Sequence, residues 1–282
     1  MFFSNFLFLT TSSSLLSCVH TEEYDFNISH PITKEKTEDT GENQEIPEIT
    51  DETPNQDSIP DEEISGPIIP DDPYCLEGMV SVRDELGEPV YCIDIFEISL
   101  DGSELGNVDQ GLEWPDDSTQ AIALSLPNVI PSSLISWYQA VAVCQNAGKY
   151  LCSTQEWKDA CDGDILGNGQ NFPYGDTWID NYCAARLGEN EQVYEELQPT
   201  GSHENCRSPF GTYDQIGNVW EWTDSLLSNE EGIPQPHKMG ASYYSGGGNI
   251  ACNSDPVTDH PPDFTGTIGA RCCASPSYPT AE

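Results

Sequence analysis

The chain has 282 residues, of which 49 are acidic and 9 are basic, and its formal net charge is -40 at pH 7. This balance excludes a nucleic-acid binder, because neutralising phosphates requires a basic face. It also excludes electrostatic attachment to anionic lipid, so any contact with a membrane has to be hydrophobic or covalent. Hydrophobic residues make up 37% of the chain. That fraction is enough for one core but not for a core that includes every residue.

The N-terminal residues 1–17 are typical of a signal peptide. The apolar and hydroxyl-bearing run Phe2–Leu16 is too short to cross a bilayer. It ends in Leu15-Leu-Ser-Cys18, which resembles the bacterial lipobox, where a peptidase cleaves before a cysteine that carries lipid. We therefore predict lipidation of Cys18 and an exported lipoprotein at the bacterial outer membrane or cell surface, attached by its lipid anchor only. The alternative is an ordinary signal peptide with an unmodified Cys18.

Residues 18–74 are predicted to form a lipidated, disordered, acidic and proline-rich tether. Between Val19 and Tyr74 the chain carries 17 acidic residues, 2 basic residues and 7 prolines. Such a segment cannot bury enough apolar surface to offset its ordering entropy. Charge repulsion and proline keep it extended, so it holds the following domain away from the membrane. The alternative is that the acidic run attracts a cationic partner or calcium.

Residues 75–275 have a sequence pattern typical of one loop-rich domain, in which short apolar segments are separated by turn residues. Alternation of apolar and polar residues predicts strands over Met79–Val82 and Val90–Ile98, joined by a turn at Glu85–Pro89. Residues 276–282 are predicted to be a disordered tail.

Two helices are expected next in the chain. Ser136 is a suitable N-cap for a helix over Trp137–Ala147. Ser153 and Glu156 have the spacing of a capping box, which predicts a second helix that runs through Trp157–Cys161.

The cysteine content indicates an oxidising compartment, because 11 cysteines in a cytosolic chain would mostly be free thiols. If Cys18 carries lipid, ten cysteines remain, an even set that is compatible with five disulfides. A bridge between Cys75 and Cys92 would close the first hairpin. The stretch from Gly163 to Phe210 looks irregular, and such a long irregular stretch is credible in a compact domain only with crosslinks.

Several segments of the domain carry patterns that recur together in one enzyme family. The most specific is Gly217-Asn-Val-Trp-Glu-Trp222 with Phe210-Gly-Thr-Tyr213 upstream. The others are Cys75-Leu-Glu-Gly-Met-Val80, Tyr91-Cys-Ile-Asp-Ile-Phe-Glu-Ile98, Ser136-Trp-Tyr-Gln-Ala-Val-Ala-Val-Cys144, Gly148-Lys-Tyr-Leu-Cys-Ser-Thr-Gln-Glu-Trp157, Phe172-Pro-Tyr-Gly-Asp176 and Ile268-Gly-Ala-Arg-Cys272. On these segments residues 75–275 resemble the formylglycine-generating enzyme family, also called the sulfatase-modifying factors.

The resemblance implies a C-type-lectin-like α+β fold, bound calcium and a copper-dependent oxidase that converts a sulfatase cysteine to formylglycine. Family members hold copper(I) with two thiolates in a loop that reads Gly-Gly-Ser, aromatic, any residue, Cys, with the second Cys five residues further on. The corresponding run here is Gly240-Ala-Ser-Tyr-Tyr-Ser245, so the thiolate positions fall on Ser245 and Ile250. Serine is a hard, weak donor to copper(I), and isoleucine offers no donor atom. Copper is therefore not expected, and Ser245 is a degenerate catalytic position.

The resemblance also implies the disulfides that join the two helices to the final strands. It pairs Cys252 with Cys161, which argues against Cys252 as a displaced copper ligand. A further pair then closes the irregular stretch, and the last pair remains by elimination. The complete expected set is Cys75–Cys92, Cys144–Cys272, Cys161–Cys252, Cys183–Cys206 and Cys152–Cys273.

The calcium site that the resemblance implies consists of Asp214, Gly217, Val219 and Glu221. Calcium takes oxygen ligands, and a tight turn at Gly217 and Asn218 can bring two carboxylates and the Val219 carbonyl together. The alternative is that this turn has a purely structural role.

These observations lead to three functional hypotheses. The first is an extracytoplasmic, monomeric lipoprotein whose domain is a non-catalytic descendant of the family and binds a protein or a glycan. The second is a formylglycine-generating oxidase with a variant metal site. The third is a structural envelope protein that is stiffened by calcium.

Overall fold

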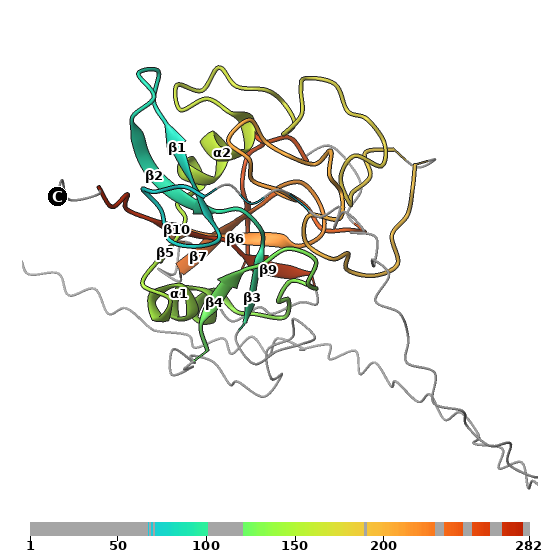
Figure 1. Ribbon diagram of the computed structural model, residues 1–282. Helices are drawn as coiled ribbons and strands as arrows, with labels where there is room; N and C mark the ends of the chain where they lie inside the picture. Colours follow the sequence, from blue (N-terminus) through green and yellow to red (C-terminus); the bar gives the residue numbers. More distant parts are fainter. Residues whose placement is uncertain are drawn as a thin grey trace, which may run out of the picture. The chain divides into compact units, whose positions relative to one another are not determined.

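The computed structural model describes residues 67, 69, 71–100, 121–188, 191–228, 234–244, 250–259 and 267–278. These residues form an α+β fold in which two helices accompany three small sheets (Figure 1). The strands are β1 (Met79–Arg83), β2 (Pro89–Asp94), β3 (Ile98–Leu100), β4 (Ala123–Ser125), β5 (Tyr150–Leu151), β6 (Trp220–Ser228), β7 (Pro234–Met239), β8 (Val257–Thr258), β9 (Ile268–Ala270) and β10 (Cys272–Ala274). The helices are α1 (Trp137–Asn146) and α2 (Thr154–Asp162).

The first sheet is antiparallel and has the strand order β1-β2-β10-β5. Its β1–β2 hairpin confirms the predicted strand, turn, strand pattern. The Asp84 carboxylate shapes the turn by accepting the amides of Leu86 and Glu88, each at 2.9 Å. Gly87 follows with a φ of 81°, a conformation that suits glycine.

The expected strand Val90–Ile98 is wrong in its extent, because the chain leaves the sheet after Asp94 and pairs again only at Ile98. The Arg271 side chain explains the interruption. Its Nη1 donates to the carbonyls of Asp94 (2.7 Å) and Ile95 (2.9 Å). These carbonyls therefore bind a buried cation, whereas in a continuous strand they would accept backbone hydrogen bonds from a neighbouring strand.

A second sheet has the strand order β8-β7-β6-β9, and in it β6 and β9 run parallel (Figure 1). The register of β6 against β9 places Glu221 opposite Gly269. Arg271 therefore follows directly after the strand that lies beside Glu221, which positions the central ion pair described below. The third sheet contains β3 and β4 only.

Both helices begin with complete capping boxes. At α1, the Gln139 amide donates to Ser136 Oγ (3.2 Å) and the Gln139 side chain accepts the Ser136 amide (2.8 Å). At α2, Ser153 and Glu156 make the same reciprocal pair, as the sequence predicts. Within the described ranges, no helix has the length and the apolar character that a membrane span requires.

The core includes two fully buried tryptophans, Trp157 of α2 and Trp222 of β6. Trp222 Nε1 donates to the Ile135 carbonyl at 2.9 Å, so its polar atom is satisfied inside the core. In the long stretch 163–219, the described residues form only turns, bends and isolated bridges. This stretch nevertheless contributes Phe172 and Ile216 to the same core as Trp157.

Disulfides hold the loop-rich domain together, and the structure brings together every expected pair. Two bridges connect neighbouring cysteines of β10 to different parts of the chain, one to α1 and one to the segment before α2. The bridges are Cys75–Cys92, Cys144–Cys272, Cys152–Cys273, Cys161–Cys252 and Cys183–Cys206. A domain bridged in this way is typical of an oxidising compartment outside the cytoplasm.

The ordered contacts extend beyond residues 75–275 at both ends. Tyr74 packs edge to face against Tyr278, with ring centroids 5.7 Å apart. The Ser277 amide donates to the Tyr74 carbonyl at 2.8 Å, and the Asp72 carboxylate accepts the amide of Ser81 at 2.9 Å. The entry and exit segments of the domain therefore pack against one another.

The two bridges to β10 are expected to support each other. While one is intact, the other closes a ring of only about ten residues, because Cys144 and Cys152 are close in sequence and Cys272 precedes Cys273 directly. Removing both opens a much longer loop. Urea unfolding of the two single-bridge variants and of the variant without both should therefore show a combined loss that exceeds the sum of the single losses by about 1 kcal/mol. Additive losses would contradict the shared-loop explanation.

Candidate functional site

The family-specific segment folds into a turn with three residues at positive φ. These are Asp214 (59°), Gly217 (95°) and Asn218 (54°). Aspartate and asparagine tolerate this left-handed conformation better than most residues do. Glycine is required at the middle position for a second reason, because a Cβ on Gly217 would lie 2.4 Å from the Ala184 carbonyl oxygen.

Glu97 anchors this turn through its carboxylate, and the sequence did not indicate it as a site residue. Its carboxylate accepts the Val219 amide (3.0 Å) and the Asn218 side-chain amide (2.6 Å). Asn218 also exchanges two hydrogen bonds with the backbone of Gln198, at 2.9 and 3.0 Å. The signal that could have identified Glu97 is its acidic side chain within the mainly apolar run Tyr91–Ile98.

A buried ion pair between Arg271 and Glu221 lies at the centre of the site. Arg271 donates to the Glu221 carboxylate from Nη2 (2.9 Å) and Nε (3.0 Å). Its remaining N–H groups donate to the carbonyls of Asp94, Ile95 and Tyr213. All five guanidinium donors are therefore satisfied, which offsets much of the cost of burying the charge.

Further buried polar contacts surround this pair. Trp157 Nε1 donates to Glu221 Oε2 at 2.6 Å. Lys149 Nζ donates to Asp94 Oδ1 at 2.6 Å, and the Cys272 amide donates to Asp94 Oδ2 at 3.0 Å. Four carboxylates, those of Asp94, Glu97, Asp214 and Glu221, are thus buried with only two described cations in contact with them.

The excess of buried carboxylates favours bound protons. Burial, followed by the charge of Glu221, raises the pKa of Asp214 to about 7, although the Gly201 amide and Arg271 oppose this shift. Burial, followed by the charges of Asp214 and Glu221, raises the pKa of Glu97 well above its ordinary value. The charge of Asp214 thus favours a bound proton on Glu97, and the two carboxyl groups titrate as a coupled pair.

Of the expected calcium positions, Asp214 and Gly217 lie in this turn, Val219 follows it, and Glu221 is in β6, where its carboxylate has other partners. Both oxygens of the Glu221 carboxylate receive hydrogen bonds from Arg271, and one of them also receives the Trp157 N–H. A calcium ion would have to share this carboxylate with a guanidinium of like charge. Among the described residues, no group of three or more His, Cys, Asp or Glu side chains is arranged to hold a metal ion. Calcium at Asp214, Gly217, Val219 and Glu221 remains a prediction.

The loop that leads to Ser245 lies directly on this turn. The Tyr243 amide donates to the Asn218 carbonyl at 2.9 Å. Gly240 has a φ of 95°, and a Cβ there would lie 2.6 Å from the Gln215 carbonyl oxygen. Ala241 has a φ of 139°, a conformation that L side chains rarely adopt. Alanine is thus strained at the position where the family pattern has its second glycine.

The thiolate positions that the family uses for copper do not supply a ligand set here. Ser245 lies outside the described residues, as does Cys18. Ile250 is 3% exposed and packs in the core beside the Cys161–Cys252 bridge. Every cysteine from Cys75 onward is in a disulfide, so the described part of the chain offers no thiolate. These residues do not fit copper(I).

A family model described as "Sulfatase-modifying factor enzyme 1-like domain" matches residues 16–275. The chain belongs to the sulfatase-modifying factor family. Its fold is accordingly the loop-rich, disulfide-bridged, C-type-lectin-like α+β fold of that family.

Individual relatives of this sulfatase-modifying factor domain include an inactive member and two kinds of enzyme. "Inactive C-alpha-formylglycine-generating enzyme 2" of Mus musculus is 28% identical over 163 residues, which cover 54% of this chain and 52% of that protein. The formylglycine-generating enzyme of Mus musculus is 25% identical over 177 residues, which cover 52% and 45%. Hercynine oxygenase of Mycolicibacterium smegmatis is 30% identical over 103 residues, which cover 36% and 23%. The chain spans about half the length of the first of these relatives.

Replacing Ala241 with glycine should stabilise the sulfatase-modifying factor domain. The substitution removes a Cβ from a strained backbone conformation, and the gain exceeds the added entropy of the unfolded chain. We expect the free energy of unfolding to rise by about 1 kcal/mol, measured in urea. Ala270→Gly, at an ordinary position of β9, is the matched control and should destabilise the domain. A loss of stability in Ala241→Gly would show that the backbone there is not strained.

The stability of the domain should depend on pH through Asp214. Because the pKa of Asp214 rises from 3.8 in the unfolded chain to about 7 in the fold, the folded state holds the proton more tightly. The resulting stabilisation is complete below 3.8 and is lost as the pH rises through about 7. Between about pH 5 and about pH 8, in the presence of a metal chelator, the free energy of unfolding of the wild type should fall by about 2 kcal/mol more than that of Asp214→Asn.

Asparagine retains an oxygen that can accept the Gly201 amide, so this variant removes the charge and leaves the hydrogen bond. Asp255→Asn, at an exposed aspartate, is the control and should follow the wild-type pH curve. Parallel curves for Asp214→Asn and the wild type would contradict the raised pKa.

Proposed function

We propose that this chain is an extracytoplasmic lipoprotein whose sulfatase-modifying factor domain is non-catalytic and binds a protein or a glycan. The observation that carries the proposal is that its cysteines are paired in disulfides. All ten cysteines from Cys75 to Cys273 are paired in disulfides. Copper(I) requires soft ligands, and a thiol bound in a disulfide is not available as a thiolate.

The surroundings of the loop that corresponds to the family's copper-binding loop support the same proposal. A thiolate at position 250 would occupy a buried core site, where isoleucine now packs with Trp157 and Cys252. Ala241 replaces a glycine of the family pattern and strains the loop that leads to Ser245. The buried isoleucine favours a packed core position over an exposed reactive pair. The similarity to a protein whose name describes it as inactive agrees with this direction.

The proposed location follows from the chain outside the domain. Cys18 is the residue that would carry lipid, and the acidic run from Val19 to Tyr74 would hold the domain away from the membrane. Five disulfides support a compartment outside the cytoplasm. We place the protein at the outer membrane or the cell surface of a bacterium, as a monomer that contacts the membrane through its lipid alone.

A copper(I) titration tests the non-catalytic role. The full chain competes with a chromophoric copper(I) chelator in the absence of oxygen, and the formylglycine-generating enzyme of Mus musculus serves as the positive control. We expect the chain to take up no stoichiometric copper and to leave a sulfatase peptide cysteine unoxidised in a mass-spectrometric assay. Ser245→Cys alone should not oxidise the peptide either, because position 250 still lacks a thiolate.

Tight binding of one equivalent of copper, together with formylglycine in the peptide, would overturn the proposal. That result would revive the oxidase with a variant metal site.

A further inference from the structure

A groove lies between the entry segment of the domain and β4. Two adjoining hollows, of about 420 and 440 Å³, make up this groove and share Ile69, Leu76, Glu77 and Gly78. We call it the β4 groove. One wall is formed by Ile69, residues 71–72 and residues 75–79, which we call the entry-segment wall, and the other is formed by β4 with the residues next to it, 122–126. The volume of each hollow falls in the range of ligand-binding pockets.

Close backbone contact and a disulfide hold the entry-segment wall in place. Gly78 has a φ of 76°, and a Cβ there would lie 2.6 Å from the Ser125 carbonyl oxygen. The absence of a side chain at Gly78 therefore lets the entry segment lie directly against β4. The Cys75–Cys92 bridge fixes the same segment to β2. The entry-segment wall is thus built on constrained backbone.

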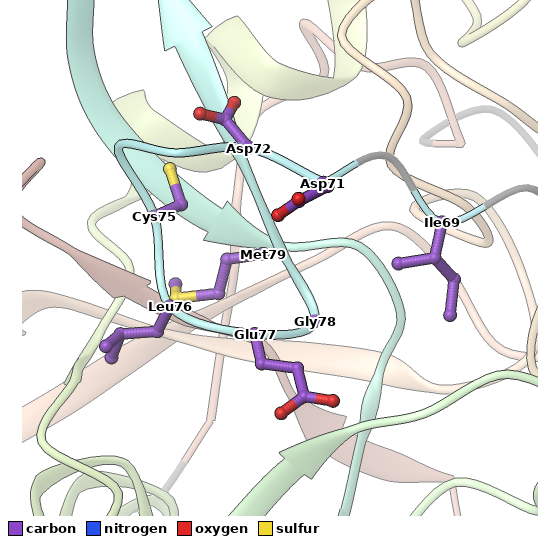
Figure 2. A pocket seen from close by; sticks show the side chains of 8 residues that line it. All are labelled: Ile69, Asp71, Asp72, Cys75, Leu76, Glu77, Gly78 and Met79. Atoms are coloured by element: carbon purple, nitrogen blue, oxygen red, sulfur yellow. The ribbon is translucent and has the colours of Figure 1, made fainter.

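Exposed apolar side chains gather along this groove. Figure 2 shows Ile69 and Leu76 at the two ends of the entry-segment wall, with Glu77 between them in this view. Four large side chains of the lining are substantially exposed: Ile69 (43%), Leu76 (47%), Ile122 (37%) and Leu126 (40%). Single exposed apolar residues are ordinary, but a contiguous set around a hollow is typical of an interaction site.

The polar residues of the groove favour a cationic partner. Asp71 and Glu77 are exposed carboxylates on the entry-segment wall. Lys149 is the one basic residue among the described residues of the lining, and its ammonium group is already bound to Asp94 at 2.6 Å. The groove therefore presents negative charge that its own lysine does not neutralise.

The chain before the groove carries the same sign of charge. Residues 19–68, which precede Ile69, contain 15 acidic and 2 basic residues. A long acidic segment that is covalently joined to an apolar groove raises the local concentration of cationic partners there. Charge and apolar surface thus point to the same kind of ligand.

We infer that the β4 groove docks an amphipathic, cationic segment of a partner protein, with apolar side chains against Leu76 and Leu126 and basic side chains beside Asp71 and Glu77. This inference rests on the proposed binding role and names the surface and the chemistry of the partner. A glycan lacks such apolar side chains, and a second copy of this acidic chain would bring like charge to the groove.

Fluorescence anisotropy with short labelled peptides and the full chain tests the inference. The probe is a peptide of alternating lysine and leucine, compared with peptides in which glutamate replaces lysine or serine replaces leucine. Only the lysine–leucine peptide should bind, and its affinity should fall with added salt. The Leu76→Ser/Leu126→Ser variant should weaken binding by about tenfold, and Glu77→Gln should weaken it by about threefold.

Matched control variants keep the result specific to the groove. Leu86→Ser changes a leucine that is 86% exposed at the β1–β2 turn, and Glu85→Gln changes an exposed carboxylate beside it. Both should leave peptide affinity unchanged. Far-ultraviolet circular dichroism of each variant confirms that the fold is retained.

Three outcomes would overturn the inference. These are equal binding of the glutamate–leucine peptide, equal weakening by the control variants, and a dimer in sedimentation that the Leu76→Ser/Leu126→Ser variant abolishes, which would assign the groove to a second copy. The copper titration tests the non-catalytic role independently of peptide binding. Loss of peptide binding therefore leaves that role standing, whereas copper uptake with formylglycine formation overturns the role whatever the labelled peptides do.

Discussion

The buried guanidinium of Arg271 is the contact on which the arrangement of this domain depends. It joins the end of β2, the residue before the Asp214–Asn218 turn, and β6, which belong to distant parts of the sequence. Because each of its N–H groups has an acceptor, the charge can be buried without an orphan donor. The same contact ends β2 early and occupies Glu221. The early end of β2 and the binding of the Glu221 carboxylate, an expected calcium ligand, therefore share one cause.

Local features of the fold could be predicted from the sequence, because their signals lie within a few residues. The Ser153 capping box and the β1–β2 hairpin are examples, and the structure confirms both. Glu97 and Arg271 were missed as partners because their contacts cross more than a hundred and about fifty residues, respectively. No periodic pattern marks such a pair. The extent of the strand Val90–Ile98 failed for the same reason, since a distant side chain interrupts it.

Sulfur has a structural role throughout the described domain. The bridges of β10 fasten both helical regions to the end of the chain, and the Cys161–Cys252 bridge packs against Ile250. A domain with so little regular structure needs such crosslinks, because its loops bury few backbone hydrogen bonds in helices or sheets. The binding surface that we infer lies elsewhere, beside β4, where the wall is held by Cys75–Cys92. Our proposal thus assigns this family scaffold a constrained binding surface in place of metal chemistry.

The most direct measurement is the number of free thiols in the mature chain. The unreduced protein is denatured, alkylated with iodoacetamide and digested, and its peptides are examined by mass spectrometry. Complete crosslinking means that no cysteine from Cys75 to Cys273 carries the alkyl group, and that the peptides joined by the five bridges separate only after reduction. Two alkylated cysteines that adjoin each other in the fold, such as Cys272 and Cys273, would supply the soft ligand pair that we exclude and would contradict a non-catalytic domain.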